Sequence, residues 1–246
     1  MLYDHFAEVY DVSLKGAPGD LNFYLKHARK AKNVLELCCG TGRILIPIAK
    51  SGVSIVGLDN SGKMLSKLNE KARKEGLKSK TILGDMRNFR INKKFDLIII
   101  PYNSFLHVEK QDEQIQTLRN IRGHLAPGGR LILNIFYPNF YYMAKKNGKT
   151  TRVKHSDYIN PKTGKRVQVS EYVKYYPIDQ LIRSQRILKE EGKPIKKLRI
   201  NLSYIYKKEF ELLLKLAGFS KYLVYGGFKN EKLKSMAEHM VWIIER

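Results

Sequence analysis

A glycine-containing turn preceded by an acidic residue is the clearest sign of chemistry in this sequence. Residues 34–42 read VLELCCGTG, and an apolar run leads into the turn. Glycine at positions 40 and 42 lets a ligand approach the backbone where a Cβ atom would collide. The Glu36 carboxylate can hold a cationic group such as an ammonium; an ordinary turn with a strand-end charge is the alternative. The predicted cofactor-binding residues of this stretch are Glu36, Cys38, Gly40, Thr41 and Gly42.

The same stretch lacks two other nucleotide-binding motifs. A dinucleotide fingerprint requires a third glycine at position 45, where this chain has Leu45. A phosphate-binding P-loop requires Gly-Lys-Ser/Thr, which does not follow this turn. The turn therefore fits neither motif.

Two further carboxylates follow the next two apolar segments. Asp59 ends the segment VGLD and is followed by Asn60, and a carboxylate there can accept both hydroxyls of a ribose. Met64 stands within one helical turn and is expected to pack on an adenine, with core packing as the alternative. Asp85 can accept an adenine amino group and the Met86 amide can donate to a ring nitrogen, although Gly-Asp is also a common turn.

An alternation of strands and helices is expected to bring these residues together. Strands alternating with helices indicate a parallel sheet with helices on both faces, whose strands end at one edge. Two helices, at 5–11 and 20–32, precede this pattern, and a helix at 207–216 and strands at 219–225 and 240–245 follow it. The strands predicted in the alternation are 33–37, 53–58, 79–83, 95–100 and 130–136, and the helices are 43–50, 62–75 and 111–125.

The pattern changes after position 137. Residues 150–206 alternate polar and apolar side chains, and 160–164 (NPKTG) is a turn signal. We expect three or four antiparallel strands there. The predicted domains are a cofactor-binding domain at 1–144 and 207–246, and an inserted β subdomain at 145–206 that covers the acceptor.

The stretch 36–42, Asp59 and the triplet 84–86 together resemble the successive motifs of the class I S-adenosylmethionine (SAM)-dependent methyltransferases. The resemblance covers residues 33–136 well and 207–246 more loosely. It implies a doubly wound, seven-stranded, mostly parallel α/β sheet of Rossmann-like form, with the last strand antiparallel. It also implies SAM as the cofactor and S-adenosyl-L-homocysteine as its product.

Within that family, three features are similar to small-molecule N-methyltransferases, including dTDP-amino-sugar N,N-dimethyltransferases. They are residues 7–11 (AEVYD), residues 84–89 (GDMRNF) and the inserted sheet. The resemblance implies methyl transfer by direct in-line displacement to a nitrogen or oxygen nucleophile of a small molecule.

The loop at 101–107 (PYNSFLH) is expected to face the methyl group in this fold. It lacks the Asn/Asp-Pro-Pro-Tyr/Phe pattern of many base-modifying enzymes, which argues against an adenine-N6 methyltransferase. His107 resembles a histidine of some amino-sugar N-methyltransferases, where a neutral imidazole can take a proton from the substrate or orient its amine. A loop histidine bonded at the domain surface is the alternative.

Aromatic and amide side chains complete the predicted site. Tyr10 is expected to lie beside the reacting groups and Tyr24 beside the cofactor, so that both side chains cover the site. The alternative is that they only pack their own helices. Asn103 and Tyr141 are the predicted acceptor-site residues, and the neighbours of Tyr141 at 140 and 142 are aromatic as well. No cluster suggests a metal. Because positioning can supply most of the acceleration, no single catalytic residue is expected to be indispensable.

Composition sets the remaining expectations. The chain has 246 residues with 43% hydrophobic side chains, no apolar run long enough to cross a bilayer, and an acidic amphipathic start without a secretory signal. Its two adjacent cysteines, Cys38 and Cys39, make neither a disulfide nor a zinc site, which favours a reducing cytoplasm. A monomer or a homodimer is expected.

The net charge is +23, and residues 145–210 carry +12 of it. An anionic partner is one explanation of such an excess, and a lysine-rich surface from genomic composition or thermal adaptation is the other, which the even spread of lysines along the chain favours. Two alternatives to a small-molecule enzyme therefore stay open. The first is an RNA or other nucleic-acid methyltransferase that docks through the basic insertion, and the second is a SAM-binding module without catalysis.

Overall fold

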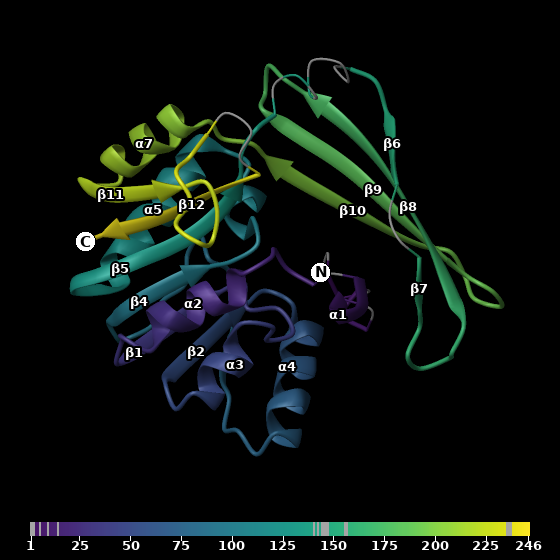
Figure 1. Ribbon diagram of the computed structural model, residues 1–246, viewed down its shortest axis with the longest axis horizontal. Coiled ribbons are helices and arrows are strands. Elements are labelled where there is room, and N and C mark those ends of the chain that lie inside the picture. The colour runs from purple at the N-terminus through teal and green to yellow at the C-terminus, as the bar shows by residue number, and fades with distance from the viewer. Residues whose placement is uncertain are drawn as a thin grey trace.

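The computed structural model contains two β-sheets, one in the body of the molecule and one standing apart from it (Figure 1). It describes residues 3–4, 6–8, 10–13, 15–139, 141, 143, 148–154, 157–234 and 238–246. No helix among these residues has both the length and the apolar character to cross a membrane.

The main sheet has seven strands in the order β11-β12-β5-β4-β1-β2-β3. Strand β12 runs antiparallel to both of its neighbours, and the other pairings are parallel. This confirms the predicted α/β class and the antiparallel last strand. The strands are β1 (Asn33–Leu37), β2 (Ser54–Asp59), β3 (Lys80–Leu83), β4 (Phe95–Ile100), β5 (Leu125–Phe136), β11 (Lys221–Tyr225) and β12 (His239–Glu245).

Helices cover both faces of this sheet because successive strand residues point to opposite sides. In β1, Val34 packs in the cluster that holds α2, α3 and α4, whereas Leu35 and Leu37 pack in the cluster that holds α5 and α7. The helices are α1 (Tyr10–Ser13), α2 (Asp20–Ala28), α3 (Leu45–Lys50), α4 (Gly62–Lys74), η1 (Ser104–His107, a 3-10 turn), α5 (Gln111–His124) and α7 (Lys207–Leu216).

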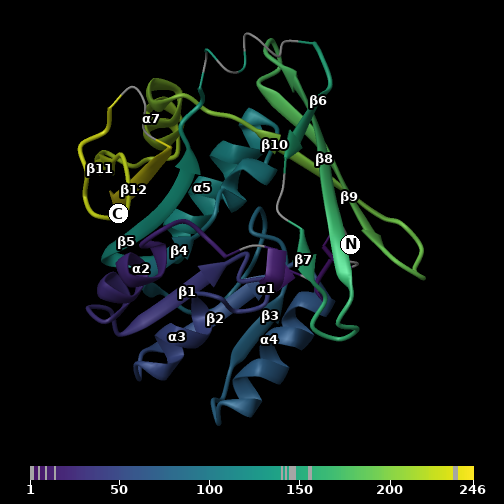
Figure 2. The ribbon, with the colours of Figure 1, turned by 45° about the vertical axis from the view of Figure 1, so that its right-hand side comes forward.

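The second sheet is antiparallel and is formed between β5 and α7 in the chain. Its path is β10-β9-β8-β6, and β7 pairs with β8 beyond it. Figure 2 shows this sheet beside the carboxyl ends of the main strands, with the N-terminal segment between them. Phe6 of that segment packs with Val167, Leu188 and Leu198 of the second sheet. The strands are β6 (Thr151–Lys154), β7 (Tyr158–Ile159), β8 (Arg166–Tyr176), β9 (Leu181–Glu190) and β10 (Lys196–Ser203).

Several predicted bounds need correction. The insertion has five described strands and not three or four, because the two-residue strand β7 is too short to produce a periodic pattern. Strand β5 begins at Leu125 and not at Arg130: the backbone continues through Pro127-Gly128-Gly129 with an irregular register against β4. Helix α2 ends at Ala28, four residues before the predicted end. The helix predicted at 5–11 begins only at Tyr10, and positions 5 and 9 lie outside the described residues.

Candidate active site

One cavity of about 410 Å³ joins the main sheet to the inserted sheet. It lies outside the carboxyl ends of β1 to β4, which is where open parallel sheets bind ligands. One half is lined by residues that follow these strands, among them Cys38, Gly40, Asp59, Asn60, Met64, Asp85 and Met86. The other half is lined by the N-terminal segment, the loop after β4, and strands β8 to β10. Ten predicted site residues meet here: these seven with Tyr10, Asn103 and His107.

The turn after β1 approaches the cavity through backbone. Cys38 and Gly40 both have positive φ, at 58° and 53°, so the chain reverses tightly at the strand end. A Cβ atom at Gly40 would meet only the Tyr10 ring within 4 Å, which leaves the cavity side open. Gly42 serves a different purpose, because a Cβ atom there would lie 2.8 Å from Leu68 of α4. Gly42 therefore allows the turn to pack against α4 and does not itself line the cavity.

Asp59 fastens this turn to the start of α4. Its two carboxylate oxygens accept backbone N–H groups from Gly40 at 2.8 Å and from Ser61 at 2.9 Å. Burial raises the pKa of Asp59 above its ordinary value. A carboxylate has about four acceptor positions, so it can accept hydroxyl donors at the cavity surface in addition to these backbone groups.

Glu36 lies in the wall behind the turn and is 2% exposed. Its Oε2 atom has no hydrogen-bond partner among the described residues. Burial raises the pKa of this carboxyl group well above its usual value, although the nearby Arg43 guanidinium acts in the opposite direction. A buried carboxyl group with one oxygen lacking a hydrogen-bond partner, beneath a glycine turn, can bind a cation. An ammonium group on the cofactor would provide such a cation.

Asp85 and Met86 form the wall after β3. Asp85 accepts a hydrogen bond from the Arg87 backbone N–H at 2.9 Å and two from the Arg87 guanidinium at 2.8 and 3.0 Å. These bonds lower the pKa of Asp85 and keep it ionised. The Met86 thioether lies 3.6 Å from the Cys38 thiol, so the first and third strand ends contact each other across the cavity.

His107 stands on the acceptor side in a defined protonation state. Its Nδ1 lies 3.0 Å from the carbonyl oxygen of Asn201, which can only accept, so Nδ1 carries the proton. Nε2 lies 2.9 Å from the Tyr3 hydroxyl, which donates to it. Burial lowers the pKa of His107 below 6.5, and the imidazole is neutral at pH 7.

Aromatic rings surround this histidine. Tyr3 packs edge-on against both His107 and Tyr10, with ring centroids 5.6 and 6.2 Å apart. Tyr102 and Asn103 follow β4 with positive φ of 56° and 62°, a conformation that aims the loop into the cavity. The Asn103 Oδ1 atom is buried without a partner in the described part of the chain. An acceptor that carries a hydrogen-bond donor would satisfy that oxygen.

The inserted sheet contributes a buried ion pair to the same cavity. Arg186 of β9 donates two hydrogen bonds to the Glu171 carboxylate of β8, at 2.7 and 3.0 Å. The two side chains are only 9% and 10% exposed. The Arg186 guanidinium also lies 5.9 Å from the centroid of the Phe6 ring. The two charges satisfy each other, and they make this side of the cavity polar.

Four predicted site residues lie away from the cavity surface, in addition to Gly42. Tyr24 is fully buried, and its hydroxyl donates to Asn134 Oδ1 at 2.9 Å, which ties α2 to β5. Thr41 donates to Asp11 of α1. Glu36 lies behind the turn. Tyr141 is 69% exposed and does not line the cavity, and its predicted neighbours at 140 and 142 lie outside the described residues.

Sequence reasoning missed eight polar residues of the lining, and the side chains of five of them have been described above. Tyr102 is adjacent to the predicted Asn103, and Arg87 is adjacent to Met86, so a wider window would have included them. Tyr3, Glu171 and Arg186 gave no local signal, because only the packing of the N-terminal segment and the insertion brings them to the site. The five described side chains are those of Tyr3, Arg87, Tyr102, Glu171 and Arg186.

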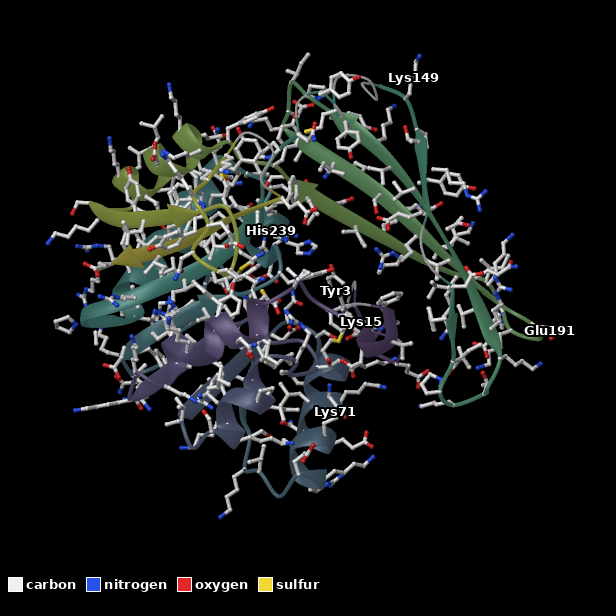
Figure 3. All side chains as sticks on the ribbon, viewed as in Figure 1. Tyr3, Lys15, Lys71, Lys149, Glu191 and His239 are labelled. Carbon is white, nitrogen blue, oxygen red and sulfur yellow. The ribbon has the colours of Figure 1, made fainter. Side chains whose placement is uncertain are left out.

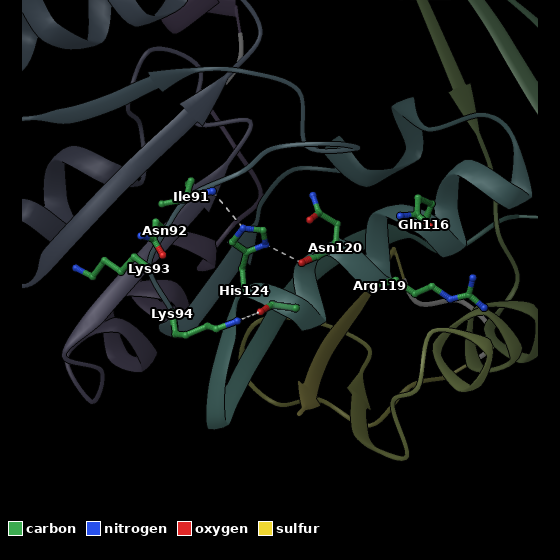
Figure 4. Close-up of a pocket in the computed structure, with 9 residues that line it drawn as sticks. Ile91, Asn92, Lys93, Lys94, Gln116, Arg119, Asn120 and His124 are labelled. Atoms are coloured by element: carbon green, nitrogen blue, oxygen red, sulfur yellow. Dashed lines mark hydrogen bonds between the residues drawn. The ribbon is translucent and has the colours of Figure 1, made fainter.

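A second hollow, at the end of α5, is explained by helix capping (Figure 4). The Lys94 ammonium donates to the Gly123 carbonyl, and His124 Nδ1 donates to the Asn120 carbonyl at 2.8 Å. These cations and donors satisfy a helix C-terminus, whose dipole disfavours anions. Among the residues that the structure describes, no group of His, Cys, Asp and Glu could hold a metal ion.

Comparison with known proteins gives a consistent result. Residues 34–129 match a family model described as "Methyltransferase domain". The chain is 33% identical over 142 residues to a cypemycin N-terminal methyltransferase of Streptomyces, covering 56% of this chain and 57% of that protein. It is 29% identical over 167 residues to the dTDP-3-amino-3,6-dideoxy-alpha-D-glucopyranose N,N-dimethyltransferase of Streptomyces fradiae, covering 61% and 64%. The chain thus spans less than two thirds of the length of these relatives.

The structural likeness extends over nearly the whole chain. The CcbJ methyltransferase of Streptomyces caelestis superposes with a TM-score of 0.79 and 26% identity, covering 94% of this chain and 96% of that one. The shared part therefore includes the inserted sheet as well as the main sheet. Residues 34–129 are thus similar to a methyltransferase domain, and the chain as a whole has the fold of solved SAM-dependent methyltransferases.

Proposed function

We propose that this protein transfers the methyl group of SAM to a nucleophile of a small polar molecule. The observation that carries the proposal is the single cavity. It connects the strand ends that resemble the SAM motifs with Tyr3, His107 and the buried Glu171–Arg186 pair. Cofactor and acceptor can therefore meet inside one space.

The cofactor half suits SAM group by group. Asp59 has acceptor positions left for the ribose hydroxyls, and Met64 lines the same wall beside it. Asp85 and the Met86 backbone face the adenine, and the orphaned carboxyl group of Glu36 offsets the cofactor ammonium. SAM supplies the methyl group on a positively charged sulfur.

The residues of the acceptor half position the nucleophile. In the reaction its lone pair forms a bond to the methyl carbon while the carbon–sulfur bond breaks, and the electron pair stays on sulfur. An amine must lose one proton before or after this step. Tyr3 donates to His107 Nε2, so a substrate ammonium that displaced the Tyr3 hydroxyl would find a neutral imidazole as its proton acceptor.

We further propose that the acceptor is an amine rather than an alcohol. His107 is held neutral by burial, and Asn103 has an unpaired carbonyl oxygen. Both favour a donor that starts as an ammonium. A reducing compartment such as the cytoplasm suits the site, because Cys38 and Cys39 are free thiols in and beside its wall.

Calorimetric titration with SAM and S-adenosylhomocysteine tests the cofactor half. We expect micromolar binding by the wild type and at least a tenfold loss in Asp59→Asn, which keeps the shape and removes the charge. Asp96→Asn is a matched control, because Asp96 also accepts two backbone N–H groups, from Lys32 and Asn33, outside the cavity. No binding to folded wild type, or an equal loss in both variants, would contradict the proposal.

A screen of amines, amino sugars and amino acids with methyl-labelled SAM then tests the acceptor half. We expect label transfer to at least one amine and no transfer to its deaminated, hydroxyl-bearing analogue. Transfer to hydroxyl compounds alone would retain the methyltransferase and remove the amine assignment.

A further inference from the structure

The inserted sheet has two chemically different faces. Opposed residues of neighbouring strands share a face, so the strand register assigns every side chain. Glu171, Arg186 and Leu198 are opposed to one another across β8, β9 and β10, and all three line the cavity. The next residues along the strands form a row on the opposite, outward face: Arg152, Tyr172, Gln185 and Arg199.

The outward face is basic. Five cations lie on it with no ion pair to any carboxylate of the described chain: Arg152, Lys174, Lys189, Lys197 and Arg199. Arg183 lies on this face as well but pairs with Glu109 at 2.6 Å. All of the five are exposed except Lys174, which is half-buried.

The acidic residues of the same strands lie on the inward face. Within the described strands β6 to β10 they are Glu171 and Glu190. Glu171 pairs with Arg186, and Glu190 is opposed to the inward Val167 and accepts from Asn160 and Thr163. A lysine-rich composition alone would scatter cations over both faces. The described strands carry two cations on the inward face, Arg186 and Lys196, so most of the unneutralised charge lies on the side away from the catalytic cavity.

Two tyrosines stand among these cations. Tyr172 is 38% exposed and Tyr176 is 37% exposed, and both lie on the outward face of β8. Four residues of strand separate them by about 13 Å. Lys174 lies between them in the sequence. Its ammonium group is 5.1 Å from the centroid of the Tyr176 ring. Tyr172 sits in the row whose ends, Arg152 and Arg199, are about 14 Å apart across three strand spacings.

We propose that the outward face of the inserted sheet is a docking surface for single-stranded RNA. Cations at these spacings can contact successive phosphates, and exposed tyrosines on a sheet can stack unpaired bases. The RNA is a docking partner and not the methyl acceptor, since the face points away from the cavity. The proposal is therefore independent of which small molecule is methylated.

The same observations disfavour other occupants. A second copy presenting this face would place like charges against each other. A membrane surface would favour a continuous apolar area beside the cations, whereas the exposed Ile159 lies on the short strand β7 and the central row holds Gln185 between Tyr172 and Arg199. Arg183 at one end of this face reaches Glu109 of the main body, but Figures 1 and 2 show no helix or strand stacked over the outward face as a whole, and in Figure 3 the labelled Glu191 lies at the far tip of the sheet.

Fluorescence anisotropy of the full chain with a labelled, unstructured 20-nucleotide RNA tests the proposal. We expect binding at low salt that weakens as salt rises, with a log–log slope of roughly −3 for four contacted phosphates. Arg152→Ala with Arg199→Ala should weaken binding tenfold or more and make the slope less negative by about 1.4. Tyr172→Ala should weaken binding with little change in slope, whereas Tyr172→Phe retains it.

Arg29→Ala with Lys30→Ala is the control, because it removes the same charge from an exposed part of the main domain. Retained binding of S-adenosylhomocysteine shows that each variant is folded. No RNA binding at low salt would overturn the proposal, and so would equal losses in the control pair. Competition by polyglutamate as effective as by RNA would assign the face to an acidic protein. A dimer converted to monomer by the Arg152 and Arg199 substitutions would assign it to a second copy.

Discussion

At the scale of single residues, the chemistry of the cavity depends on which polar atoms already have hydrogen-bond partners within the protein. His107 is bonded at both ring nitrogens, to Asn201 and Tyr3. His107 acts as a base together with these hydrogen-bond partners. Removing its ring should therefore weaken the positioning of the acceptor without eliminating the reaction. We expect His107→Ala to lower kcat by no more than about 100-fold, with SAM binding unchanged. Steady-state rates and calorimetry check this, and complete loss of turnover with SAM still bound would make His107 an obligatory base.

The same histidine predicts an acid limb in the rate profile. The pKa of His107 is below 6.5 in the folded protein because of burial, so the imidazole is neutral at pH 7. Protonation at lower pH removes the acceptor lone pair from Nε2 and breaks the bond to Tyr3. We expect kcat to fall as pH drops through a midpoint below 6.5, and His107→Gln to lack that limb. Between the two pKa values the unfolded chain binds more protons, so the unfolding free energy also falls as pH drops below 6.5.

Arg186 carries a further prediction at this scale. Arg186→Met leaves the Glu171 carboxylate buried without its counter-charge, which costs about 3 kcal/mol of unfolding free energy. Glu171→Gln combined with Arg186→Met should recover most of that loss, because no uncompensated charge remains. Urea unfolding of the three variants measures both effects. A double variant as unstable as Arg186→Met alone would show that packing, and not the charge, is responsible.

At the scale of elements, Ser61 connects three parts of the molecule. Its hydroxyl accepts from the Met64 backbone N–H as the N-cap of α4 and donates to Asp4 of the N-terminal segment at 2.5 Å. That bond lowers the pKa of Asp4 to about 2, so the carboxylate stays ionised. We expect Ser61→Ala to cost about 1 kcal/mol through the lost cap. Thermal unfolding measures this cost, and limited proteolysis should show earlier cleavage of the N-terminal segment than in Ser51→Ala. Ser51→Ala is the control because its hydroxyl bonds only the Ile48 carbonyl of its own helix.

The sequence predicted those helices and strands whose apolar residues recur in a regular local pattern. The apolar runs of β1, β2 and β4 and the Asp59 strand end were readable because a parallel sheet buries whole strands and exposes their carboxyl ends. Tyr3 and Arg186 were not readable. They lie 104 and 79 residues from His107 in the chain, and only the docking of separate elements brings them to the cavity. Tyr24 shows the converse: its helical spacing was right, but its hydroxyl found Asn134 and not the site.

At the scale of the whole molecule, charge is the dominant feature. The chain has 46 Lys and Arg residues against 23 Asp and Glu, so 23 cations stay unmatched even if every carboxylate pairs. About half of the excess lies in residues 145–210, and most cations on the described strands of the inserted sheet lie on its outward face. Like-charge repulsion therefore acts most strongly within one sheet of the folded state, and dissolved salt can screen it.

We therefore expect the midpoint of thermal unfolding to rise with added NaCl. The Debye length falls from about 30 Å at 0.01 M to about 10 Å at 0.1 M, which is shorter than the span of the outward row from Arg152 to Arg199. Arg152→Ala with Arg199→Ala should raise the midpoint at low salt and reduce its dependence on salt. Differential scanning calorimetry from 0.01 to 0.3 M NaCl measures both. A midpoint that falls with salt would mean that attractive surface pairs such as Arg166–Asp157 outweigh the repulsion, and that the outward cations do not lower the stability of the fold.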